Sequence, residues 1–177
     1  MLVSGDASVS GSPGDQTPSR ERTVNAAVEA NAGVPVTEIL KHDLYAALWW
    51  PSIDAGIVRA GDLRSWRVQP AFIRGSLHVP PGCEKVAGLM ALYCQLVNDL
   101  EAPPLIRSAM AHWAFETIHP YPDGNGRIGR LLMNLLLGAD GQPWITIVVD
   151  EGAEYFSALQ RAQVDEEFGP WGRFLAR

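Results

Sequence analysis

Apolar residues recur at helical spacing along most of the chain and predict a succession of helices. One of them covers residues 37–49, with Thr37 as its N-cap and Pro51 as its expected end. Another begins at the Pro103-Pro104 pair, because proline is well tolerated in a first helical turn. The expected helices after residue 80 cover residues 84–99, 104–117, 127–138, 151–162 and 170–177.

One stretch breaks this helical pattern. Residues 67–78, with the sequence RVQPAFIRGSLH, are extended and rich in residues that favour strands, and Gly75-Ser76 can form a turn. We interpret the stretch as one short β-hairpin. The predicted fold is therefore mainly α (all-α), a helical bundle with a single hairpin.

The amino-terminal segment has a different composition. Residues 1–22 are rich in Ser, Gly, Pro and Asp and are expected to form a disordered tail, because they contain too little apolar surface to offset chain entropy. Order is expected from Thr23, with a short helix through Glu29 that ends by Gly33. Residues 23–177 then form one folded domain.

Composition excludes several classes of protein. With 177 residues, 47% of them apolar, the chain can bury a sizeable core. Its net charge of −6 argues against nucleic acid as the main partner. No apolar run approaches the roughly 18 residues of a membrane span, and the start lacks the pattern of a secretory signal. The two cysteines, Cys83 and Cys94, suggest no disulfide framework, so we expect a cytoplasmic protein.

The densest chemistry lies in IHPYPDGNGRIGRL, residues 118–131. Gly124-Asn125-Gly126 directly precede a helix, so backbone N–H groups and the positive end of the helix can bind an anion there. Arg127 and Arg130 lie on one face of the first turn, where guanidinium groups can bind further phosphate oxygens. The pattern predicts a site for a polyphosphate.

Three further side chains complete this site. His119 is largely neutral at pH 7 and can accept a proton. Asp123 offers a hard oxygen ligand suited to Mg²⁺ beside phosphates, and Asn125 can donate an amide hydrogen to a phosphate oxygen. A simpler interpretation is a solvated loop with a helix cap, in which Asp123 and the arginines only pair with each other. That interpretation leaves the convergence of base, metal ligand and anion site unexplained.

The segment HPYPDGNGRIGR resembles the signature of the Fic family, His-Pro-Phe-x-Asp/Glu-Gly-Asn-Gly-Arg-x-x-Arg. Only Tyr121 departs from it, at a position where Phe is common and where the ring is expected to anchor the loop in the core. The resemblance continues through RLLMNLLL, PWITI, YFSALQRA and PWGRFLA. Upstream, FIRGSLHVPP is similar to the hairpin, or flap, that precedes the signature. Altogether, the resemblance to the Fic family covers most of residues 36–177 and implies an all-α bundle with a β-hairpin.

Fic enzymes mostly transfer AMP from ATP to a hydroxyl group of a target protein. The resemblance implies that His119 deprotonates a target Ser, Thr or Tyr and that Asp123 holds Mg²⁺. Phosphate oxygens of ATP are then expected at Gly124, Asn125, Gly126, Arg127 and Arg130. The flap is expected to pair with the target's backbone as an added strand through Ile73, Arg74, Gly75, Ser76 and Leu77.

Glu29 is a second feature of the resemblance. Many Fic proteins carry an inhibitory helix with Ser/Thr-x-x-x-Glu-Gly/Asn, whose glutamate pairs with the second signature arginine, here Arg130. The segment NAAVEAN keeps Glu29 but has Asn25 and Ala30 at the flanking positions. Glu29 is therefore either inhibitory or an ordinary surface residue of a short helix.

Other histidines and arginines are interpreted as structural. His112 has no further metal ligands nearby and is expected in the core, whereas His78 ends the flap and is expected to support it. Arg64 and Arg67 are expected to lie on the surface or to brace a loop.

Three alternative functions stay open at this stage. The site can use another phosphate-containing donor, such as UTP, GTP or a CDP-alcohol. It can remove AMP from a modified target, with Glu29 positioning a water. The domain can also be a non-catalytic binding module or the toxin half of a regulated pair. The expected partners are ATP and a target protein; neither nucleic acid nor a membrane is expected. Self-modification and a homo-oligomer are also compatible with this interpretation.

Overall fold

The computed structural model describes residues 33–56, 59 and 63–177, and the regular structure in this part of the chain is helical. The helices are α2 (Glu38–Asp54), α3 (Cys83–Asp99), α4 (Pro104–Ile118), α5 (Asn125–Ala139), the short 3₁₀ turn η2 (Val149–Glu151), α6 (Gly152–Val164) and α7 (Phe168–Leu175). The predicted all-α class is confirmed. The predicted tail and the helix containing Glu29 lie outside the described residues.

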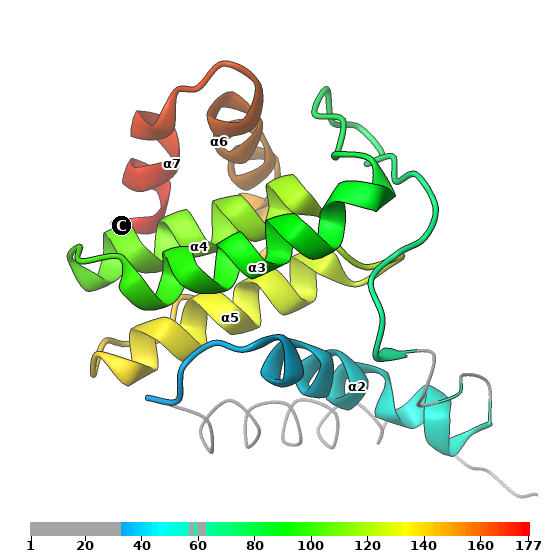
Figure 1. The fold of residues 1–177 in the computed structure, drawn as a ribbon. Coiled ribbons are helices and arrows are strands. Elements are labelled where there is room, and N and C mark those ends of the chain that lie inside the picture. The colour runs from blue at the N-terminus through cyan, green and yellow to red at the C-terminus, as the bar shows by residue number, and fades with distance from the viewer. Residues whose placement is uncertain (1–32, 57–58, 60–62) are drawn as a thin grey trace, which may run out of the picture.

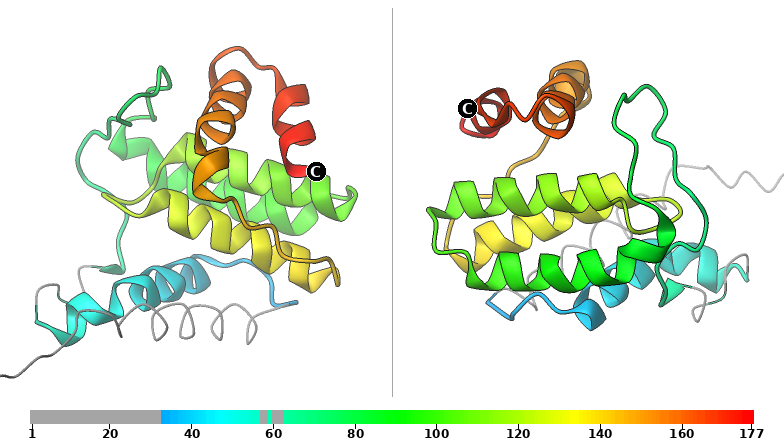
Figure 2. Two further views of the ribbon diagram at one scale, coloured as in Figure 1. Left: turned by 180° about the vertical axis from the view of Figure 1, so that it is seen from behind. Right: turned by 45° about the horizontal axis from the view of Figure 1, so that its top comes forward.

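Helices α3, α4 and α5 run alongside one another and form the middle of the molecule (Figure 1). Helix α2 packs against α5 on one side of this group, and the α6–α7 pair packs against α4 on the other side (Figure 2). Within the described part of the chain, no helix combines the length and apolar character needed to cross a bilayer. The cytoplasmic location stays a prediction.

Helix α5 is the centre of the core. Most of its apolar side chains are buried, as expected for a helix that packs against several others. Those that are buried are Ile128, Leu132, Met133, Leu135, Leu136 and Leu137. Some of them pack with α2, α3 and α4, whereas Met133 and Leu137 pack with α6 and α7. The single helix therefore joins two apolar clusters into one core.

Gly129 lets α4 approach α5 closely. A Cβ at this position would lie 2.5 Å from Oε1 of Glu116 and 3.1 Å from the ring of His112, both on α4. Any larger residue would push these two buried side chains away. The last turns of α4 therefore lie directly against the first turns of α5.

The prediction that Pro51 ends the helix expected over residues 37–49 is wrong. Helix α2 continues to Asp54, and Gly56, with φ of 69°, ends the turn that follows. The N–H of Gly56 donates to the carbonyl of Ile53 at 2.9 Å. A proline removes one helical hydrogen bond but does not prevent one more turn, so the left-handed glycine is the stronger end signal.

The predicted β-hairpin is also corrected. The described residues contain no β-strand, although residues 67–78 still form a loop of two arms, which we call the flap (Figure 2). Its turn is closed by the N–H of Ser76, which donates to Ile73 at 3.1 Å. The N–H of Leu77 instead donates to Oε1 of Gln160 at 2.9 Å. The second arm is thus bound to α6 through this hydrogen bond.

Candidate active site

The signature loop connects α4 to α5 and places His119 at its beginning. The N–H of His119 donates to Phe115 at 2.9 Å and so caps α4. His119 is left-handed, with φ of 50°, a conformation that costs free energy in a residue other than glycine. Such a conformation persists only where the surroundings hold it, and Arg67 is the residue that does so here.

Arg67 joins the flap to the signature loop from inside the protein. It is 4% exposed, and its Nε donates to the carbonyl of His119 at 2.8 Å. Its other N–H groups donate to the carbonyls of Gln69, Pro81 and Ile118. Its own backbone N–H donates to Pro120 at 2.8 Å. Of the two expectations for Arg67, loop bracing is therefore the one that holds.

Asn125 shapes the loop from the other side. Its Oδ1 accepts the backbone N–H of Tyr121, and its Nδ2 donates to the carbonyl of Tyr121, both at 2.8 Å. The residue is 2% exposed. Both ends of the amide therefore bind the loop, and the second Nδ2 hydrogen is the one left for the direct phosphate contact expected for this side chain.

Tyr121 anchors the loop in the core, as predicted. Its ring is fully buried and stacks on Tyr45, with ring centres 3.8 Å apart. Its hydroxyl group is 3.0 Å from Nδ1 of His42, which is itself buried. The extra oxygen relative to Phe thus has a hydrogen-bond partner, so tyrosine fits this position.

Positive charge gathers at the start of α5. Gly124 is the N-cap, with φ of 80°, and no side chain caps the helix, so its first N–H groups remain available. A Cβ on Gly126 would lie 3.4 Å from Nη1 of Arg130, which places that guanidinium beside the same turn. Arg127 lies over the ring of Trp49 at 5.2 Å and is half-exposed. These groups lie together at the position where the sequence predicts an anion site.

Asp123 lies at the rim of this anion site. Its carboxylate is 72% exposed and 3.6 Å from Arg127. No cluster of three or more His, Cys, Asp or Glu in the described residues is arranged to hold a metal ion alone. A Mg²⁺ ion needs only one or two carboxylates when phosphates and water complete its shell, so Asp123 fits such an ion.

The ring of His119 is mostly buried, and burial lowers its pKa to about 4. The positive charge of Arg67 contributes to this lowered pKa, whereas the Glu116 carbonyl and Asp123 act in the opposite direction. Since the ring is neutral at physiological pH, it can accept a proton. His78 has its predicted supporting role, with Nε2 2.9 Å from the carbonyl of Thr117.

Glu116 is a site residue that the sequence reasoning missed. Its side chain is buried, and Oε2 lies 3.8 Å from Nδ1 of His119. Burial raises the pKa of its carboxyl group to about 7, although Arg130 opposes this shift. Its position three residues before His119 on an apolar helix is the signal that identifies it. His112, also on α4, is fully buried as predicted, and its Nε2 is 2.9 Å from the Tyr155 hydroxyl.

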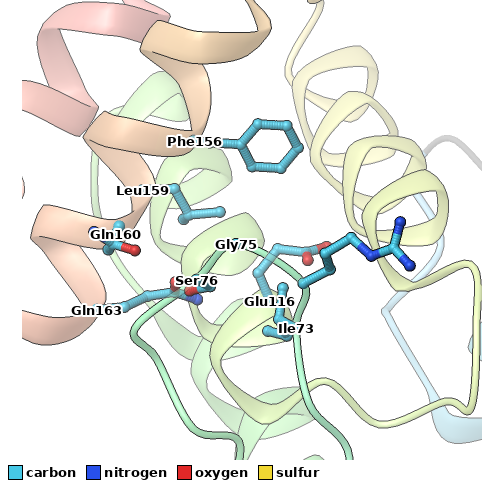
Figure 3. Close-up of a pocket in the computed structure, with 9 residues that line it drawn as sticks. Ile73, Gly75, Ser76, Glu116, Phe156, Leu159, Gln160 and Gln163 are labelled. Atoms are coloured by element: carbon cyan, nitrogen blue, oxygen red, sulfur yellow. The ribbon is translucent and has the colours of Figure 1, made fainter.

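The flap separates two hollows. The first, of about 340 Å³, contains His119 and Pro122 and is lined by the first arm of the flap, residues 67–72. The second, of about 230 Å³, lies between α6 and the flap tip, with Glu116 on its wall (Figure 3). Of the predicted flap residues, Ile73, Arg74, Gly75 and Ser76 line the second hollow. The part of the flap beside His119 is instead its first arm, residues 67–72.

The sequence model of the Fic/DOC family matches residues 42–137. Among curated proteins, the protein adenylyltransferase Fic of Aedes aegypti is 39% identical over 122 residues, which are 67% of this chain and 23% of that protein. The relative from Caenorhabditis briggsae, also a protein adenylyltransferase, is 32% identical over 127 residues, 70% of this chain and 24% of that protein. The chain thus spans about a quarter of the length of these relatives.

The fold is also that of solved Fic proteins. A Fic-domain signaling protein from Bacteroides thetaiotaomicron matches with a TM-score of 0.76 at 21% identity, over 99% of this chain and 71% of that one. Because the family model covers more than half of the chain and includes the whole signature loop, the chain belongs to the Fic/DOC family.

Proposed function

We propose that this chain transfers AMP from ATP to a Ser, Thr or Tyr hydroxyl group of a target protein. The observation that carries the proposal is the position of a neutral, mostly buried His119 on the loop that leads into the uncapped start of α5. A base next to an anion site is the arrangement that transfer of a phosphate-linked group requires. The names of the relatives support the same activity.

In this mechanism His119 removes the proton of the target hydroxyl while the oxygen attacks the α-phosphate of ATP. Pyrophosphate leaves with the electrons of the broken P–O bond. The backbone N–H groups at Gly124 and Gly126 hold phosphate oxygens, and Arg127 and Arg130 neutralise the charge of the β- and γ-phosphates. The Asn125 side chain holds the loop through Tyr121.

Asp123 would hold Mg²⁺ beside the α- and β-phosphates. Its exposed carboxylate at the rim of the anion site supports this assignment. The ion would supply charge neutralisation to the leaving pyrophosphate. In the structure Asp123 lies 3.6 Å from Arg127, and both side chains are exposed, so each can exchange this contact for a ligand.

The base of the nucleotide would occupy the hollow between α6 and the flap tip. This hollow offers an aromatic ring from Phe156, aliphatic surface from Ile73 and Leu159, and two carboxamides, Gln160 and Gln163 (Figure 3). Flat apolar walls with a few polar groups suit a purine ring. The carboxamides can donate and accept hydrogen bonds at its edge, although the Oε1 of Gln160 already accepts the N–H of Leu77.

The target segment would lie along the first arm of the flap, in the hollow beside His119. The arm includes Val68 and Phe72, which are 77% and 84% exposed. An exposed arm of this kind suits the addition of a target strand, which holds the hydroxyl in place without reading much sequence. This assignment moves the target contact from the tip, residues 73–77, to residues 68–72.

Incubation of the purified protein with Mg²⁺ and one donor at a time, followed by intact-mass spectrometry, tests the proposal. The donors are ATP, GTP, UTP and CDP-choline, with a lysate as a source of targets. The expected result is addition of AMP from ATP, abolished by His119→Ala, while calorimetric ATP affinity stays nearly unchanged. Transfer that persists in His119→Ala would refute the assignment of the base. Exclusive use of another donor would refute ATP as the substrate.

Glu29 lies outside the described residues, so its pairing with Arg130 remains part of the proposal. Glu29→Gly is expected to raise transfer if this pairing blocks the γ-phosphate site. The same change in an Arg130→Ala background should then have no effect, because the glutamate would have lost its partner.

A further inference from the structure

His119 and Glu116 form a buried pair at the end of α4. Nδ1 of His119 is 3.8 Å from Oε2 of Glu116, and the two side chains are 19% and 8% exposed. Nδ1 of His119 is buried and has no hydrogen-bond partner, and Oε2 of Glu116 is the carboxylate oxygen that faces it. The other oxygen, Oε1, points toward Gly129 of α5. Unpartnered buried polar atoms are costly. An unpartnered Nδ1 with a buried carboxylate oxygen 3.8 Å away indicates that the contact between these side chains closes at some step of the protein's work.

The space around Glu116 is built to keep this carboxyl group beside His119. Its Oε1 lies where a Cβ at position 129 would clash, so only glycine at that place on α5 leaves room for the group. On the other side Glu116 forms part of the wall of the hollow under the flap (Figure 3). The carboxyl group therefore lies between the base and the proposed nucleotide pocket.

We propose that Glu116 is a positioning residue for His119, whose carboxylate binds the Nδ1–H of the ring, directs Nε2 toward the target hydroxyl and balances the charge of the protonated ring. This inference rests on the proposed role of His119 as base. In the reaction, the hydroxyl proton moves to Nε2 as the new O–P bond forms. The Nδ1 proton is then shared with, or passed to, Oε2, and the pair finally releases one proton to water.

Electrostatics supports a base made of two groups. Burial lowers the pKa of His119 to about 4, and an imidazole with so low a pKa is a weak base. Burial also raises the pKa of Glu116 to about 7. A base made of these two groups therefore takes up its first proton at Glu116, close to neutral pH, where a general base is most effective.

Other titratable or charged groups surround the pair. They are His112 on α4, Arg130 on α5, Tyr155 on α6, Tyr93 on α3, Arg74 at the flap tip, and Arg67, His78 and Asp123 beside His119. Of these, Arg130 favours the ionised form of Glu116. A phosphate bound at Arg130 would weaken that effect, so the carboxyl group would bind its proton more readily with nucleotide present.

The kinetic test compares Glu116→Gln with the wild type across pH 5 to 9. In the wild type, kcat should fall as pH decreases through about 7, because the pair must be deprotonated to act as a base. In Glu116→Gln, kcat at neutral pH should fall by roughly 10 to 100-fold, and the acid limb should move down by more than one pH unit. The KM for ATP should change by about twofold at most. Glu154→Gln on α6 is the matched control and should change neither quantity.

A lower kcat with an unchanged acid limb would mean that Glu116 is only structural, and would overturn the proposal. The isosteric glutamine should preserve the fold, which thermal unfolding and the amide spectrum can verify.

A second measurement needs no turnover and so separates this inference from the proposed function. For NMR, the protein is prepared with ¹⁵N-labelled histidine, and the ring signals of His119 are assigned by comparison with the His119→Ala variant. In the resting wild type, the Nδ1 signal should respond to the ionisation of Glu116 near pH 7, and Glu116→Gln should remove this response. A His119 signal identical in both proteins would overturn the pairing. If the variant fails to fold, the wild type alone still tests the pairing. A His119 signal that shows only its own titration, and no step near pH 7, would overturn the pairing.

Discussion

The guanidinium group of Arg67 donates to the backbone carbonyl of His119 at 2.8 Å, across 52 residues of sequence. The same side chain reaches the carbonyls of Ile118, Pro81 and Gln69. One buried arginine thus fixes the left-handed backbone of the proposed base and the foot of the flap together. Arg67 therefore links the geometry of the base to that of the hollow beside it.

Arg67→Lys should therefore impair both stability and transfer. A lysine keeps the charge but loses the planar fork, so several buried carbonyls are left without a donor. We expect a loss of about 2–4 kcal/mol in the free energy of unfolding and a drop in kcat. Urea denaturation and initial rates would measure these effects. Arg64→Lys is the matched control, since Arg64 pairs with Asp43 on the surface and should lose no more than about 0.5 kcal/mol. Equal losses in both variants would contradict the role of Arg67.

Asn125→Ala should lower both stability and nucleotide affinity. The side chain supports the loop through two hydrogen bonds to Tyr121, so its loss should cost about 1–3 kcal/mol of stability and loosen the anion site. Asn134→Ala offers a comparison, because Asn134 binds the N–H and carbonyl of Ile145 in the same way. That variant should lose similar stability but keep its ATP affinity in calorimetry. Weaker ATP binding in Asn134→Ala to the same degree would mean that general destabilisation explains both.

Gly124→Ala should damage the anion site more than an ordinary left-handed glycine replacement. The position has φ of 80°, and a Cβ would lie 3.2 Å from Cδ2 of Leu48. Gly141→Ala shares the positive φ, at 66°, but its Cβ meets nothing within 4 Å. We expect a cost of about 1 kcal/mol for Gly141→Ala and a larger cost for Gly124→Ala, with lost ATP binding only in the latter. Thermal unfolding with and without ATP separates the two, and an ATP-induced stabilisation that survives Gly124→Ala would count against the site.

Cys94→Ala should destabilise the protein through Lys41. This lysine is fully buried, its Nζ lies 2.7 Å from Sγ of Cys94, and burial lowers its pKa. Without the sulfur the amine has lost its hydrogen-bond partner, so a cost of about 1–3 kcal/mol is expected. The lowered pKa means that the unfolded chain binds the extra proton, so stability should rise as pH increases toward 10.5. Lys41→Met in the Cys94→Ala background should recover much of the loss.

Cys83→Ala is the control for that pair, because Cys83 is also free and half-buried but begins α3 rather than contacting a buried amine. Its effect should stay within about 0.5 kcal/mol. Similar losses in the two cysteine variants, measured by urea denaturation, would show that Lys41 does not depend on Cys94.

The features that the sequence determined are those encoded by neighbouring residues. Helical spacing located α3 to α7 to within a few residues, and the run from His119 to Arg130 predicted a base, an acidic rim and an anion site in one loop. Periodicity and glycine placement act within a few residues of chain, so they can be read without a fold. The same local interpretation was wrong at Pro51, where the left-handed Gly56 is the stronger end signal, and for the hairpin, whose second arm is bound by Gln160 of α6.

Only the tertiary structure decided which side chains complete the site. Arg67 reaches His119 from 52 positions away, and the second arm of the flap is held through Gln160, 83 positions from Leu77. Glu116 is close to His119 in sequence, yet its raised pKa comes from burial against Gly129 of another helix. Burial and long-range hydrogen bonds depend on how segments pack, and no local pattern of residues contains that information.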